Sequence, residues 1–160
     1  MKKFLAVFFA VICFASVVQA ERLELTTEKF FAWCEKHGIP DYSLIAGSLD
    51  SEEEDGQLTM SGEFKATSGE LKIMTVDVDH ISIMNEHDFD KPDAEIKIIK
   101  RLTVAGRKAI YIELKDIDAN SIVVALSEVN GAVSVLSRPS ISEEQFVDLM
   151  GKLNYQALIK

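Results

Sequence analysis

The sequence predicts an α+β fold: one mainly antiparallel, curled sheet of about six or seven strands, with an N-terminal and a C-terminal helix packed on it. Two observations carry this prediction. Apolar residues recur at helical spacing near both ends of the chain. Between these ends, apolar and polar residues alternate in short segments that turn residues separate, and such hairpin-like spacing favours antiparallel neighbours.

Residues 1–20 have the three parts of a secretory signal peptide. Lys2 and Lys3 give a positive start, an apolar run follows over 4–18, and the chain reaches Ala20 through residues that suit a signal peptidase. The run is shorter than the roughly 20 apolar residues of a membrane-spanning helix. We therefore expect cleavage after residue 20, export to the periplasm or secretion, one α+β domain over 21–160, and no stable membrane span after cleavage.

The expected mature chain is strongly acidic. The full sequence has 17 basic and 26 acidic residues, and removal of the two signal lysines leaves 15 against 26, a formal charge of −11. This charge disfavours nucleic acid and anionic membranes as partners, and it permits a basic partner or a bound cation. Cys13 leaves with the signal, so Cys34 has no disulfide partner within the chain and the fold has to depend on its core.

Capping residues mark both helices. A helix is predicted over 27–37, because threonines can cap its start and a glycine followed by a proline ends it. The last helix begins after Ser142, which forms a capping box with Gln145. Its apolar stripe continues to Leu158, and Gly151 is expected to lower its stability without interrupting it.

The segments between the helices suit strands, because their apolar residues alternate and β-branched residues are frequent. The predicted strands cover 44–49, 57–66, 70–84, 94–104, 108–114, 121–129 and 132–137. Within 70–84 the apolar side chains change parity after Val78, which predicts a bulge or a bend near Asp79-His80.

Two turns set the expected pairing of the later strands. The Asn-Gly pair at 130–131 suits a two-residue type I′ turn, which would pair Leu126 with Val135. A three-residue loop over 105–107 would place Leu102 opposite Ile110. That register also leaves one strand with a discordant residue or a bulge.

Histidine and carboxylate residues gather near the expected bend. Asp77, Asp79 and His80 are followed by His87 in an acidic loop, and imidazole with carboxylate suits a divalent metal. In a strand the two aspartates share one face, whereas His80 points the opposite way unless a bulge turns it. The alternative interpretation is a polar strand edge followed by an acidic turn, which is favoured and implies no cofactor.

Two further signals are weaker. The acidic segment 50–56 has the composition of a calcium loop, but its glycine and acidic positions fit neither register of an EF-hand. A solvated turn between strands is favoured, and a patch for a divalent cation or a basic partner is the alternative. Cys34 and His37 are one helical turn apart and could form a reactive pair, but a lone cysteine among aromatic residues is usually a small core residue.

No catalytic motif accompanies these residues, such as a nucleophile elbow, a phosphate-binding loop or a dinucleotide fingerprint. We therefore expect a non-catalytic binding domain for a protein partner or a small apolar ligand. Phe30, Phe31 and Trp33 cover more of the first helix than one sheet contact requires, so part of this surface is expected to face the ligand. The alternatives are a divalent-metal-binding protein that uses His80, His87 and the nearby aspartates, and a structural envelope component.

Overall fold

The computed structural model describes residues 24–80, 98–114 and 117–160. Three helices lie in these residues: α1 (Thr27–Lys36), α2 (Glu143–Gly151) and α3 (Tyr155–Ile159). The strands are β1 (Tyr42–Leu44), β2 (Asp50–Glu54), β3 (Gln57–Ala66), β4 (Ile73–His80), β5 (Ile98–Val104), β6 (Arg107–Leu114), β7 (Ala119–Leu126) and β8 (Gly131–Arg138). None of the described helices has the length and apolar character that crossing a membrane requires.

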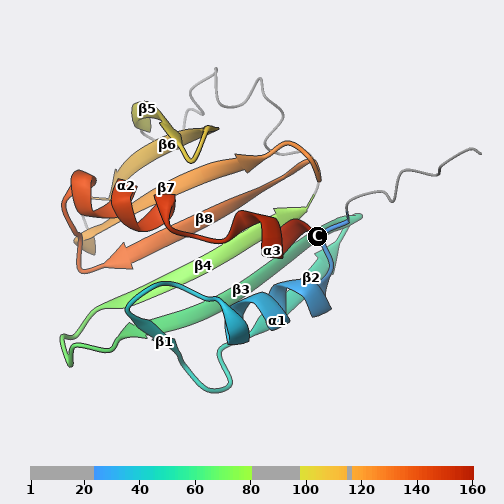
Figure 1. Ribbon diagram of the computed structural model, residues 1–160, viewed down its shortest axis with the longest axis horizontal. Coiled ribbons are helices and arrows are strands. Elements are labelled where there is room, and N and C mark those ends of the chain that lie inside the picture. Colours follow the sequence, from blue (N-terminus) through green and yellow to red (C-terminus); the bar gives the residue numbers. More distant parts are fainter. Residues whose placement is uncertain (1–23, 81–97, 115–116) are drawn as a thin grey trace, which may run out of the picture.

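All of these strands join one antiparallel sheet, and the helices lie on one of its faces (Figure 1). The strand order is β1-β3-β4-β8-β7-β6-β5, and β2 continues along the edge of β3 that β1 occupies. The sheet is not closed, and β5 and β6 are turned relative to β3 and β4 at the top of Figure 1. The predicted α+β class, with an antiparallel sheet and flanking helices, is therefore confirmed.

The main core lies between the helices and one face of the sheet. Met74, Val76 and Val78 of β4 are fully buried on this face, which is the alternation that the sequence predicts for the strand. Phe30 of α1 and Phe146 of α2 belong to the same cluster. We call the opposite side of the sheet the open face, because none of the described helices covers it.

The first described helix contacts the C-terminal helices on the covered face of the sheet. The Trp33 Nε1 of α1 donates a hydrogen bond of 3.0 Å to the carbonyl of Asn154, which lies between α2 and α3. The prediction of one uninterrupted last helix is wrong, since α2 ends at Gly151 and the Asn154 side chain caps α3. At this interruption the Asn154 carbonyl accepts two hydrogen bonds, one from the indole and one of 3.2 Å from the Ala157 N–H of α3. The capping box of Ser142 and Gln145 is present as predicted.

Both predicted turn registers are wrong. Leu126 pairs with Gly131 rather than Val135, because the turn has four residues and buries Val129 in the core. Val104 pairs with Arg107 across a two-residue turn in which Ala105 and Gly106 have φ of 49° and 77°. Alanine rarely adopts this left-handed conformation, so the sequence favoured a longer loop. The register shift between Ile98 and Lys100 agrees with the predicted bulge.

The acidic segment is a strand and not a solvated turn. β2 occupies Asp50–Glu54 at the edge of the sheet, and the tight turn that follows consists of Asp55 and Gly56. All five residues of β2 are exposed, which is why an acidic sequence is tolerated there. Charged side chains also protect an edge strand from pairing with other chains. The predicted strand residues 81–84 and 94–97 lie outside the described part of the chain.

Two glycines should respond in opposite directions to alanine. Gly151 has no atom within 4 Å of the position that a Cβ would take, so Gly151→Ala should stabilise the fold by about 0.5–1 kcal/mol. Gly38 has φ of 53° and its Cβ would lie 2.8 Å from Phe64 Cε1, so Gly38→Ala should destabilise it by about 1–3 kcal/mol. Urea unfolding followed by circular dichroism measures both, and equal shifts would contradict the assigned conformations.

Trp33→Phe should lower the free energy of unfolding by about 1–3 kcal/mol, because the variant loses a buried hydrogen bond and leaves unfilled volume. Trp33 is the single tryptophan, so unfolding has to be followed by circular dichroism. Tyr155→Phe is the matched control, because it also removes one buried side-chain hydrogen bond. That bond, of 2.8 Å from the Tyr155 hydroxyl to the Met150 carbonyl, lies within the C-terminal helices and does not join them to α1. An unchanged unfolding midpoint for Trp33→Phe would refute the role of this contact.

Candidate functional site

The aromatic residues predicted to form a binding surface lie in the core. Phe30 and Trp33 are buried, and Phe31 is half-buried against the same cluster. The rings of Phe30 and Trp33 are stacked with their centroids 6.4 Å apart. The sheet packs on one side of α1 and α3 on another, so this helix buries more of its circumference than a single sheet contact would. A binding surface therefore has to be sought elsewhere.

The structure describes only part of the predicted metal set. Asp77 and Asp79 lie on the open face of β4, two residues apart and both half-buried. His80 is the last residue of β4 and pairs with Leu58 and Gly131 through the backbone. His87 lies outside the described residues. Among the described residues, no group of three or more histidine, cysteine or carboxylate side chains could hold a metal ion. The metal site stays a prediction.

Asp77 has an unusual electrostatic environment. Burial raises the pKa of its carboxyl to about 6, and the negative charge of Asp79 adds to the shift. The residues in register with Asp77 are uncharged: Ser61 on β3 and Ser134 on β8. Ser134 in turn shares a hydrogen bond of 3.0 Å with Ser121 of β7. The carboxylate thus sits in a polar row of the sheet without a cation beside it.

Cys34 does not have the properties of a reactive thiol. The side chain is buried, and burial with the nearby Glu35 raises the pKa of the thiol to about 12. At neutral pH the group is therefore protonated and a poor nucleophile. Its sulfur lies 3.5 Å from the position that a Cβ on Gly62 would take, so it fills space where α1 approaches β3.

An apolar hollow lies at one end of the open face. Among the described residues, the large apolar side chains that remain exposed are Leu71, Ile73 and Ile117, with exposed fractions of 93%, 41% and 46%. All three line the same hollow, which has a volume of about 580 Å³. They come from the turn before β4, from β4 itself and from the segment before β7. Neighbouring apolar side chains that are left in water together are typical of a binding surface.

Charged side chains surround the hollow. Glu63 of β3, Asp118 and Arg138 line it together with Pro139. Ile73 and Arg138 are in register on β4 and β8, so the cation sits beside the apolar floor. The Ser140 N–H donates to the Asp118 carbonyl over 3.0 Å. This bond joins the segment before β7 to the segment after β8 at the edge of the hollow. Within the described residues, none of these three charged side chains forms an ion pair.

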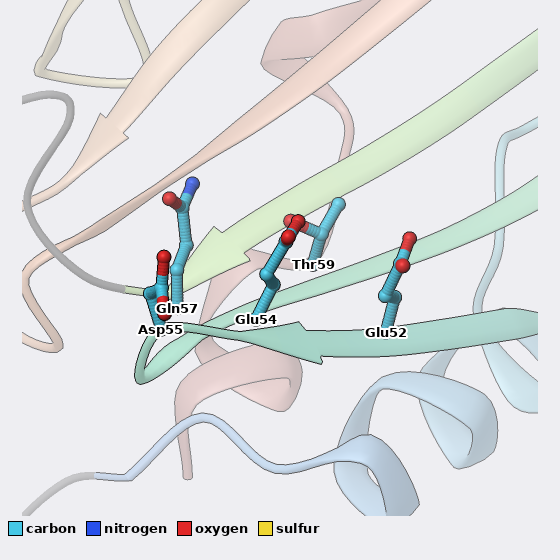
Figure 2. Close-up of a pocket in the computed structure, with 5 residues that line it drawn as sticks. All are labelled: Glu52, Glu54, Asp55, Gln57 and Thr59. Atoms are coloured by element: carbon cyan, nitrogen blue, oxygen red, sulfur yellow. The ribbon is translucent and has the colours of Figure 1, made fainter.

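A second, acidic hollow lies at the other end of the same face. Its volume is about 270 Å³, and Figure 2 shows the side chains that line it pointing to one side of β2 and β3. These are Glu52, Glu54, Asp55, Gln57 and Thr59. The residues belong to the acidic segment for which the sequence left a cation or a basic partner as the alternative. The hollow contains acceptor oxygens and no basic side chain, so it disfavours anions.

Sequence reasoning missed the apolar hollow because no local pattern connects its residues. Leu71 was placed inside a strand over 70–84, whereas β4 begins at Ile73. Ile117 stands alone between Asp116 and Asp118. A large aliphatic residue in a charged turn is the signal that could have drawn attention, because such turns usually expose their side chains. Comparison of the chain with protein-family models, with curated proteins and with solved structures finds no match in any of the three.

The pKa of Asp77 predicts a dependence of stability on pH. Its folded value of about 6 exceeds the ordinary 3.8, so the folded state binds more protons between these values, and stability should fall as pH rises from about 4 to 6. Asp77→Asn should remove this change and should stabilise the protein at pH 7 by on the order of 1 kcal/mol, after allowance for solvent screening. Unfolding measured at pH 4.5 and 7 checks it, with Glu144→Gln on α2 as control. Equal pH dependence in Asp77→Asn and the unsubstituted protein would refute the assignment.

Proposed function

We propose that the protein is a small, exported, non-catalytic binding domain, and that its partner binds in the apolar hollow of the open face. The observation that supports the proposal is the gathering of Leu71, Ile73 and Ile117 around one hollow. Binding sites typically combine an apolar floor with a few polar groups that fix orientation, and here Glu63, Asp118 and Arg138 supply the polar groups.

The other functions considered from the sequence have weaker support. A divalent-metal site would require the Asp77 and Asp79 pair to be completed by ligands, and the described residues supply no such group. A structural envelope component requires no exposed apolar hollow. Both remain hypotheses, and metal analysis of the purified protein addresses the first.

A pull-down from the cells that produce the protein tests the proposal. The tagged protein and its Leu71→Ser/Ile117→Ser variant are expressed at equal levels, and retained proteins and lipids are quantified by mass spectrometry. We expect at least one component to be retained by the original protein and reduced about tenfold or more with the variant, since each aliphatic side chain contributes on the order of 1 kcal/mol when buried.

Two controls accompany this experiment. Glu35→Gln/Glu144→Gln changes two exposed residues on the helices and should retain the same component. Thermal unfolding should be unchanged in Leu71→Ser/Ile117→Ser, because both side chains are exposed. A set of retained components that is identical for all variants would refute the hollow as a binding site.

N-terminal sequencing of the mature protein tests export, and a chain that still begins at Met1 would count against it.

A further inference from the structure

The open face has a strongly uneven charge. On β2, β3 and β4 the carboxylates on this face are Asp50, Glu52, Glu54, Glu63, Asp77 and Asp79. We call these six residues the acidic strip. Lys65 is the basic residue that the described parts of these strands present on the same face. Beyond these strands, Arg138 of β8 lies beside the apolar hollow, and on the same face Arg101 lies on the far strand β5 and Lys108 on its neighbour β6.

The carboxylates of the acidic strip lack cationic partners. Ion pairs in the described part of the chain link Lys72 with Glu70, Lys100 with Glu143, Arg107 with Glu128, and Lys152 with Asp148. None of these pairs includes a residue of the acidic strip, and no other ion pair of these six residues exists in the described structure. Like charges that lie close together on a sheet repel one another, so a cationic partner would stabilise this surface.

The acidic strip is continuous with the apolar hollow. Glu63 belongs to both, and Asp77 and Asp79 follow Ile73 on the same face of β4. Alternate residues of a strand are about 7 Å apart, and the distance from Ile73 to Asp79 along β4 is about 20 Å. An extended polypeptide has the same spacing, so its alternate side chains could meet the carboxylates while one end occupies the hollow. A small apolar ligand in the hollow would meet only Glu63 among these six carboxylates.

We propose that the partner is a basic polypeptide segment that places an aliphatic side chain in the apolar hollow and lysine or arginine side chains along the acidic strip. This inference rests on the proposed function, since it names the class of partner for the same hollow. The complementary charge supports a polypeptide of this kind over an acidic protein or a zwitterionic lipid, because neither of these has a net positive charge to offer to six unpaired carboxylates.

Fluorescence anisotropy with synthetic peptides tests the inference on the purified protein. The first probe is a labelled 12-residue peptide with blocked ends, two leucines near one end and lysines at alternate positions after them. The second probe replaces the leucines with serine, and the third replaces the lysines with glutamate. Phosphatidylcholine vesicles are the fourth probe. We expect the first peptide to bind about tenfold or more tightly than the second and the third, and we expect no binding to the vesicles.

Paired variants separate the two parts of the surface. Leu71→Ser/Ile117→Ser should weaken binding of the first peptide about fivefold or more and leave its salt dependence unchanged. Asp77→Asn/Asp79→Asn should weaken it about fivefold at low salt and have less effect at 0.5 M salt, where charges are screened. Glu35→Gln/Glu144→Gln removes the same number of charges from the helices and should change the affinity less than twofold.

Several results would overturn this inference. Equal affinity for the lysine and glutamate peptides, binding to the vesicles in place of the peptide, or an equal loss with the helix variant would each exclude a basic segment on this face. A pull-down in which the hollow-dependent component is an acidic protein or a lipid would refute the inference and leave the proposed function standing. A pull-down without any hollow-dependent component would refute the proposed function itself.

Discussion

The hydrogen bond from the Trp33 indole to the Asn154 carbonyl joins the beginning of the fold to its end. The two residues are 121 positions apart, and the contact closes a layer of helices over one face of the sheet. An indole N–H in a core requires an acceptor, and the interruption between α2 and α3 provides one. Phe30 stacks on the same indole, so the aromatic residues of α1 form the centre of this layer.

Because the helices cover one face of the sheet, the sequence of each strand also determines which side chains the open face presents. Side chains of a strand alternate between the two sides of the sheet, so each strand that contributes to the core also presents alternate residues to the open face. On β4 this alternation sets Met74, Val76 and Val78 against the helices and leaves Asp77 and Asp79 outside. The same rule aligns the carboxylates of the acidic strip with one another and with the apolar hollow.

Predictions based on one segment at a time agree only in part with the structure, since the strand predicted over 44–49 is absent and β1 and β2 lie at its two ends. The predictions that agree, which are the first helix, the capping box of the last helix and the alternation in β4, depend on residues a few positions apart. Predictions that depended on register did not agree. The turn before β8 is longer than its Asn-Gly pair suggests because Val129 has a place in the core, and Ala105 adopts a conformation that its residue type disfavours. Packing of Val129 decided the first case, and packing is not visible in a turn sequence, whereas Ala105 is exposed and its case is one of backbone conformation alone.

The sequence by itself determined the α+β class and the side of the sheet that most strand residues occupy, because these follow from local periodicity and capping. Only the tertiary structure decided that Phe30 and Trp33 are core residues, since α3 covers the side of α1 that the sheet leaves free. The apolar hollow is likewise a product of the tertiary structure. Leu71, Ile73 and Ile117 meet because β4 and β7 both flank β8 and the turns before them reach the same end of the sheet. Strand order is a long-range property, and no spacing within the sequence encodes it.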